Sequence, residues 1–214
     1  MSRGPLTKHA LYHRIFFSLG VKLGGIRWYA AWPLFAWGTG ISLICVLYTK
    51  NDRRMNRNAE DILVDGTIIS VIAGVVEEIT FRWLFFLGNI VSLKITNFLF
   101  FGFFGFGIPE WTHLHILGPI VDIITLHGLT PYLFHHTGWA VGAAMIATNS
   151  FFRDGHKYQG VFGWTNSWFG GMFFFYLMFT YGLLAAIAVH FLYDFLIFLV
   201  RYIDAAIERA QGYV

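Results

Sequence analysis

The chain has 214 residues, of which 57% are hydrophobic and 13% are charged. Soluble domains contain about 25% charged residues, so this composition argues against a soluble protein and for one embedded in lipid. The formal net charge is +3, but the basic residues stand beside apolar runs, as membrane anchors do, which argues against a nucleic-acid partner. We therefore expect a small, multi-pass integral membrane protein that contacts lipids.

The first part of the chain is basic and weakly amphipathic. Residues 1–27 mix five basic side chains with apolar ones, which predicts an interfacial N-terminal segment or, equally, a solvated tail. Residues 28–204 form the expected membrane-embedded helical domain, and 205–214 a short C-terminal tail. The first expected span, 28–48, has roughly the 20 residues that a bilayer core requires. Basic residues flank it on both sides, so membrane orientation stays open.

The sequence predicts several more helices after residue 48. A helix is predicted over 62–93, which is longer than one untilted span. The aromatic and glycine-rich residues 97–107 predict a closely packed helix, and 108–115, beginning Ile-Pro-Glu, predict a turn or interfacial loop. The last two spans are predicted at 168–186 and from 187 onward. The whole pattern predicts an all-α bundle of about six to eight transmembrane helices with a catalytic cavity inside.

The segment 75–86 places two carboxylates and an arginine inside an apolar run. An ionised side chain at bilayer depth costs roughly 2.5–3.5 kcal/mol on insertion scales, so three together require a role. In a helix, Glu78 and Arg82 lie one turn apart, in the acid-before-base order that pairs best. The Glu77 side chain is rotated about 100° around the helix axis from that of Glu78, so it points toward a different neighbour. One carboxylate thus has a partner in its own helix, and the other is available for chemistry or a distant partner.

Two further residue pairs, each with at least one ionisable side chain, have the same four-residue spacing. Phe152 and His156 form one, and His190 and Asp194 the other. Ionisable groups inside membranes usually face a bundle interior and pair with one another, so we expect these pairs to converge. A carboxylate that faces a histidine in a semi-dry cavity can activate a water molecule as a general base.

The three pairs occur in the order Glu-Glu-x-x-x-Arg, Phe-x-x-x-His and His-x-x-x-Asn/Asp. This order resembles the CPBP (Abi) family of CAAX prenyl proteases and bacteriocin-processing proteins. The matching residues are Glu77, Glu78, Arg82, Phe152, His156, His190 and Asp194. The stretches 156–160 and 183–190 also resemble family sequence beside the second and third motifs. The resemblance covers about residues 62–200, and its specificity comes from all three motifs occurring in order.

The resemblance implies an intramembrane glutamic endopeptidase that carries no metal or other cofactor and cuts a peptide or lipid-modified protein substrate. By family analogy, Glu77 with His156 activates the hydrolytic water. His190 and the residue four positions later stabilise the oxyanion, and Glu78 with Arg82 orders the site.

One position departs from the pattern of the eukaryotic CAAX proteases, which have asparagine where this chain has Asp194. An ionised aspartate accepts hydrogen bonds but cannot donate one to an oxyanion. Either Asp194 is protonated, or it orients His190 and leaves His190 as the donor.

Three alternatives use the same residues differently. A glutamate with two histidines is a catalytic zinc ligand set, which would make the protein a metalloprotease. A non-catalytic membrane scaffold or bacteriocin-immunity protein is a second alternative. A transporter with a proton relay is a third, although the chain is short and shows no inverted repeat. Five other histidines could suggest metal, but such residues are common in interfacial loops: His113, His115, His127, His135 and His136.

Overall fold

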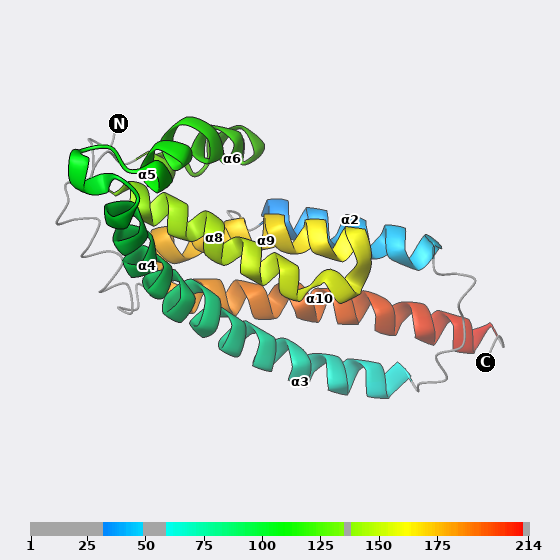
Figure 1. The fold of residues 1–214 in the computed structure, drawn as a ribbon. Helices are drawn as coiled ribbons and strands as arrows, with labels where there is room; N and C mark the ends of the chain where they lie inside the picture. The colour runs from blue at the N-terminus through cyan, green and yellow to red at the C-terminus, as the bar shows by residue number, and fades with distance from the viewer. Residues whose placement is uncertain (1–31, 49–58, 135–137, 212–214) are drawn as a thin grey trace, which may run out of the picture. The chain divides into compact units, whose positions relative to one another are not determined.

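The computed structural model describes residues 32–48, 59–134 and 138–211. These residues form helices and turns, with no strand among them, so the all-α prediction is confirmed. The chain divides into two compact units, and Figure 1 labels their main helices. The central unit comprises Ile79–Leu184, and the flanking unit comprises the described residues before and after it.

The flanking unit is built from three long helices. These are α2 (Trp32–Tyr48), α3 (Ala59–Glu77) and α10, which runs over Leu183–Ala210 and lies in this unit from Ala185. Gly38 of α2 lies directly against the Tyr193 ring of α10. A side chain at position 38 would therefore push α2 away from α10.

Small residues recur at every fourth position of α3. They are Gly66, Ser70 and Gly74, and the Ser70 hydroxyl donates a hydrogen bond of 2.6 Å to the Gly66 carbonyl. A Cβ atom at Gly74 would lie 3.1 Å from both the Ile187 carbonyl oxygen and the Phe191 amide nitrogen of α10. Small residues at this spacing let two helix backbones approach closely. The next position in the series, four residues on, is Glu78.

The central unit begins within η3, a π-helix that spans Glu78–Phe85 and leads into α4, Phe86–Leu99. Helix was predicted over 62–93, and this prediction is confirmed by α3, η3 and α4 together. π-Helical turns are rare in proteins and occur frequently at functional sites. Here the π-helix coincides with the first motif.

The core of the central unit lies where α4 meets α8 (Trp139–Gly155) and α9 (Gly160–Tyr181). The Phe86 ring lies 5.4 Å from that of Phe175 and 5.5 Å from that of Phe179, measured between centroids. The short 3₁₀-helix η6 (Lys157–Gln159) joins α8 to α9. The turn ends at Gly160, whose φ of +74° is a left-handed conformation that favours glycine.

Shorter elements connect α4 to α8, and here two predictions were wrong. A helix was expected over 97–107, but α4 ends at Leu99 because Phe101 takes a left-handed φ of +68°. A turn or loop was expected over 108–115, but these residues are helical. The connecting elements are η4 (Gly102–Phe104), α5 (Ile108–Thr112), η5 (His113–Leu117), α6 (Gly118–Ile124) and α7 (Thr130–Leu133).

The helix at 108–115 has a clear physical origin. Pro109 stands in the first turn of α5. Backbone amides in a first turn have no acceptor within the helix, so the amide hydrogen that proline lacks costs no hydrogen bond there. The Asn97 side chain accepts a hydrogen bond of 2.9 Å from the Glu110 amide, which fixes the start of α5 against the end of α4. Proline therefore begins a helix here, where the sequence pattern suggested a break.

Six helices of the described part have fourteen or more residues: α2, α3, α4, α8, α9 and α10. Among the described residues, only α10 is long and apolar enough to cross a membrane by length and composition. The boundary between the last two helices was predicted at 186/187. It lies instead at Gly182, whose φ of +97° ends α9 before α10 begins. A bundle of six to eight spans stays a prediction.

Candidate active site

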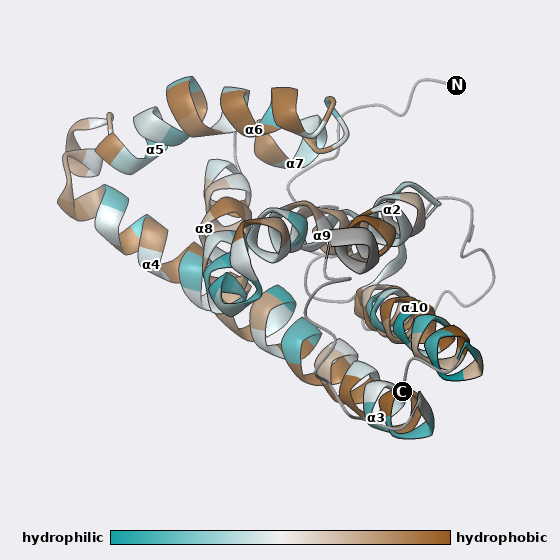
Figure 2. Ribbon diagram, turned by 90° about the vertical axis from the view of Figure 1, so that its right-hand side faces the viewer, coloured by the Kyte–Doolittle hydropathy of each residue, from teal (hydrophilic) through white to brown (hydrophobic). Residues whose placement is uncertain are grey.

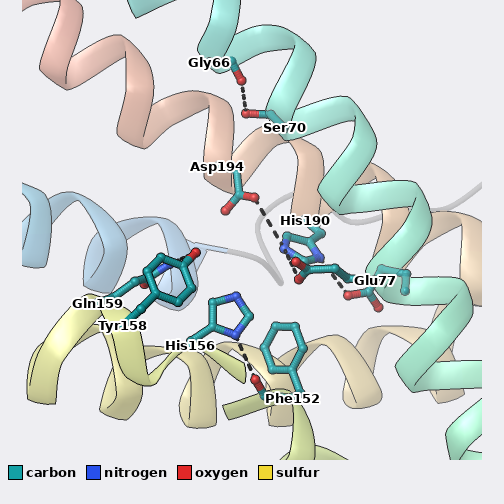
Figure 3. Close-up of polar contacts among 10 residues, drawn as sticks. Gly66, Ser70, Glu77, Phe152, His156, Tyr158, Gln159, His190 and Asp194 are labelled. Atoms are coloured by element: carbon teal, nitrogen blue, oxygen red, sulfur yellow. Dashed lines mark hydrogen bonds and ion pairs between the residues drawn. The ribbon is translucent and has the colours of Figure 1, made fainter. Parts of the chain in front are cut away.

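The His190 side chain lies among the candidate carboxyl groups of the flanking unit (Figure 3). Its Nδ1 lies 2.7 Å from Glu78 Oε1. Its Nε2 lies 3.5 Å from Asp194 Oδ2 and 3.9 Å from Glu77 Oε2. One imidazole thus has three carboxyl groups within 4 Å, two from the α3–η3 junction and one from its own helix.

The helices of this unit explain why these groups meet. The small residues of α3 bring its backbone against α10 around Ile187 and Phe191, and His190 lies within this contact. Asp194 follows His190 by one helical turn, so both side chains lie on the same face of α10.

One detail of the sequence prediction was wrong. Glu77 was expected to point toward a different neighbour from Glu78, but both carboxyl groups approach the His190 ring. The two side chains are long enough to converge on an imidazole that projects between them. They differ in exposure, because the Glu78 side chain is fully buried while that of Glu77 is 29% exposed. Glu77 is therefore the carboxylate that water can reach.

The hydrogen-bond pattern defines how the His190 ring can act. A carboxylate can only accept, so the 2.7 Å bond to Glu78 requires the ring hydrogen on Nδ1. In the neutral ring Nε2 is then a proton acceptor, and after taking up a proton it is a donor. Asp194 Oδ2, 3.5 Å from Nε2, is at the limit of hydrogen-bonding distance, whereas Glu77 Oε2, at 3.9 Å, lies beyond it and within ion-pair range.

Arg82 is the first candidate site residue of the central unit, and it is fully buried. The centre of its guanidinium lies 4.0 Å from the centroid of the Phe152 ring. Phe174 and Phe175 of α9 are next, at 5.2 and 5.5 Å. A cation held over an aromatic face is attracted by the electron-rich ring, most strongly when water is excluded. The phenylalanine of the second motif therefore supports the arginine of the first.

His156 follows directly after α8. Its Nδ1 donates a hydrogen bond of 2.8 Å to the Phe152 carbonyl oxygen (Figure 3). Because a carbonyl oxygen only accepts, the hydrogen is on Nδ1, and Nε2 is the proton acceptor in the neutral ring. This is the tautomer that a general base needs.

The turn that carries His156 is held by Asp154. The Asp154 carboxylate accepts a hydrogen bond of 3.0 Å from the Trp164 indole of α9 and one of 2.9 Å from Arg153 Nε. Lys157 Nζ lies 3.0 Å from its other oxygen. These contacts, with the bond from Trp164 as the largest, lower the pKa of Asp154 to about 2. One ionised carboxylate thus connects α8, η6 and α9 around His156.

The structure therefore brings the predicted residues together in two groups. Glu77, Glu78, His190 and Asp194 meet in the flanking unit. In the central unit, Arg82 and His156 both contact one residue, through the ring and the carbonyl oxygen of Phe152. The predicted pairs Glu77 with His156 and Glu78 with Arg82 join different units, and they stay predictions.

Sequence reasoning missed the residues that position these groups. The Gly66, Ser70 and Gly74 series was visible as small residues at four-residue spacing, a pattern typical of closely packed membrane helices. Asn149 and Gly171, which lie beside Arg82, had no local signal, because their role depends on how α8 and α9 pack.

The other histidines have local partners where the structure describes them. His113 Nε2 lies 2.8 Å from the Leu133 carbonyl oxygen, and His127 Nδ1 lies 2.7 Å from Asp122 Oδ2. His135 and His136 lie outside the described residues. In the described ranges, no group of three or more His, Cys, Asp or Glu side chains is placed to hold a metal ion.

Comparison with known proteins identifies no relative. No protein-family model matches the chain, and neither the curated proteins nor the solved structures contain a significant match. The functional conclusion therefore depends on the motifs and on the geometry of the two groups.

Proposed function

We propose that the protein is an intramembrane endopeptidase in which Glu77 and His156 activate water for peptide-bond hydrolysis. The observation that carries the proposal is the 2.7 Å bond between His190 Nδ1 and Glu78 Oε1, which joins residues of the first and third motifs in one unit. Two buried ionisable groups from distant parts of an apolar chain are costly to place there without a function.

In the proposed reaction, Glu77, His156 and His190 each have one role. The Glu77 carboxylate takes a proton from water, and the water oxygen attacks the peptide carbonyl carbon. His156 Nε2 accepts a hydrogen bond from the same water. The tetrahedral intermediate collapses, the C–N bond breaks, and the proton on Glu77 passes to the leaving amine. His190, in its protonated form with a hydrogen on each ring nitrogen, donates from Nε2 and stabilises the developing oxyanion, a contribution that is typically worth a factor of about 10²–10³.

The remaining residues have supporting roles in this proposal. Glu78 holds His190 through the Nδ1 hydrogen bond. Asp194, 3.5 Å from Nε2, orients the ring rather than donating to the oxyanion. Arg82, buried against Phe152, orders the first motif.

A multi-pass membrane setting is supported by the exposed surface. Soluble monomers rarely expose contiguous apolar patches larger than a few hundred Å². Helix α3 exposes large apolar side chains at helical spacing along one face. Helix α6 is coloured largely hydrophobic in Figure 2. The exposed residues of α3 include Val64, Ile68, Val71, Ile72 and Val75. We infer that these faces contact lipid and that the cut substrate is a peptide or lipid-modified protein tail reached from the bilayer surface.

The decisive experiment uses purified protein in proteoliposomes with a matched pair of C-terminal peptides, one farnesylated and one unmodified, and a bacteriocin-leader peptide. Mass spectrometry identifies the cleaved bond. The parent and Glu60→Gln, an exposed position at the start of α3, should cut. Glu77→Gln and His156→Ala should lose activity by at least about 10²-fold, as removal of a general base does.

Other results would favour a different function. Equal cleavage by the parent, Glu77→Gln and His156→Ala would refute the assignment of these residues. Loss of activity with a chelator, restored by zinc, would identify a metalloprotease. Partner binding that survives both substitutions, with no peptide cut by the parent, would identify a scaffold or immunity protein.

A further inference from the structure

The environment of Arg82 contains a second buried polar residue that no motif includes. Asn149 stands one turn before Phe152 on α8 and is fully buried. Its Nδ2 donates a hydrogen bond of 2.9 Å to the Trp168 carbonyl oxygen of α9. Its Oδ1 is buried and has no hydrogen-bond partner among the described residues. A buried acceptor without a partner is costly, so a donor should lie nearby.

The surroundings of Gly171 point to a candidate donor, Arg82. A Cβ atom at this position of α9 would overlap Asn149 Oδ1 and would lie 3.0 Å from Arg82 Nη2. The amide oxygen and the guanidinium nitrogen therefore lie against the same point of the α9 backbone. Only the absence of a side chain at Gly171 leaves room for both groups.

We propose that Asn149 is a positioning residue for Arg82, with its amide oxygen placed beside the guanidinium, in the space left by Gly171, to accept a hydrogen bond that is not formed in the static structure. The Phe152 ring, 4.0 Å away, covers the guanidinium face, and Asn149 fixes its edge. A guanidinium held on both a face and an edge keeps one orientation. The inference rests on the proposed function only for its effect on hydrolysis.

The direct test is the rotation of the Arg82 guanidinium about its Nε–Cζ bond. In protein labelled with ¹⁵N-arginine and placed in lipid nanodiscs, a held guanidinium gives separate signals for its two Nη nitrogens. Arg82→Lys assigns these signals by their disappearance. We expect separate signals in the parent and in Asn149→Asp, because a carboxylate oxygen still accepts. We expect merged signals in Asn149→Leu.

Two features make the test specific. Asn149→Asp and Asn149→Leu both lose the donor to Trp168, so a role limited to that bond would affect them equally. Ser150→Ala is the control, because the Ser150 hydroxyl donates to Ile146 of its own helix and should leave the signals separate. Separate Arg82 signals in a folded Asn149→Leu variant would overturn the proposal. If that variant does not fold, Asn149→Ala decides in the same way.

Hydrolysis provides a second readout. Asn149→Leu should lower kcat by about 10- to 100-fold with little change in KM, since a misplaced supporting group costs orientation more than binding. Asn149→Asp should keep most of the parent kcat. A parent that cuts no peptide would contradict the proposed function, while the guanidinium signals would still decide the role of Asn149. Equal kcat loss in both variants would contradict positioning through the amide oxygen.

Discussion

His190 Nδ1 lies 2.7 Å from Glu78 Oε1, although 112 residues separate the two along the chain. Both side chains are buried, whereas Glu77, whose Oε2 lies 3.9 Å from the other ring nitrogen, Nε2, is 29% exposed. This contrast distinguishes the surroundings of two adjacent glutamates in an apolar helix. Glu78 holds the histidine, and Glu77 is left accessible to water.

The first prediction concerns the stability of this pair. Glu78→Leu leaves the His190 ring without its Nδ1 partner in a buried place. Removing one member of a buried charged pair usually costs about 3–5 kcal/mol. We expect Glu78→Leu to lower the free energy of unfolding by about this amount, measured by denaturation in detergent micelles. Glu60→Leu, on the exposed first turn of α3, should change it by less than about 0.5 kcal/mol. Equal losses would show that the bond does not stabilise the fold.

The second prediction concerns the contact between α3 and α10. Gly74→Ala places a methyl group 3.1 Å from two backbone atoms of α10, which cannot rotate away. We expect a loss of about 1–3 kcal/mol, as overpacking usually costs. Gly88→Ala in α4 meets nothing within 4 Å and should stabilise by about 0.5–1 kcal/mol, because alanine favours helix. Opposite signs of the two melting-temperature shifts are the expected result, and two shifts of the same sign would contradict it.

Much of the fold was predictable because hydrophobic periodicity reports helices directly. The long helix through the first motif was predicted, since four-residue spacing of Glu78 and Arg82 fits a helix. The helix at 108–115 was not, because Pro109 reads as a helix breaker. Its effect here depends on Asn97, which the fold brings close enough to accept a hydrogen bond from the Glu110 amide.

The site was predictable in its residue types but not in its pairings. The three motifs identified Glu77, Glu78, His190 and Asp194 as candidates, and the structure gathers these four. That Glu78 would pair with His190 could not be read from spacing, because the pair depends on α3 packing against α10. The local interpretation instead paired Glu78 with a residue of its own helix, a pairing that remains a prediction.

The third prediction concerns Asp194, which stands where the eukaryotic CAAX proteases have asparagine. If Asp194 orients His190 through Nε2, 3.5 Å away, then Asp194→Asn should still orient the ring through its amide oxygen. We expect its kcat on a cleaved peptide to stay within about tenfold of the parent. Asp194→Leu removes the acceptor and should lower kcat by about 10²-fold, within the range for one stabilising contact at an oxyanion site. Equal activity of Asp194→Leu and the parent would contradict an orienting role.

The fourth prediction concerns the turn that carries His156 and its dependence on pH. The pKa of Asp154 is lowered from 3.8 to about 2, first by the hydrogen bond from Trp164 and then by Lys157. Because the folded-state pKa lies below the ordinary value, the ionised carboxylate stabilises the fold above about pH 4. That stabilisation is lost as the pH falls through about 2. Asp154 is at the exposed end of α8, so solvent screening keeps the effect modest.

Asp154→Asn isolates this effect. The parent should melt at a higher temperature than the variant at pH 5, and the difference should shrink toward zero as the pH falls from about 4 to 2. Asp61→Asn, on the exposed first turn of α3, is the matched control and should leave the acid-side slope of the parent unchanged. In parallel, the Trp164 indole N–H signal, which reports the 3.0 Å bond to Asp154, should shift with a midpoint near pH 2. A constant difference between parent and Asp154→Asn across this range would show that the carboxylate does not hold the turn through its charge.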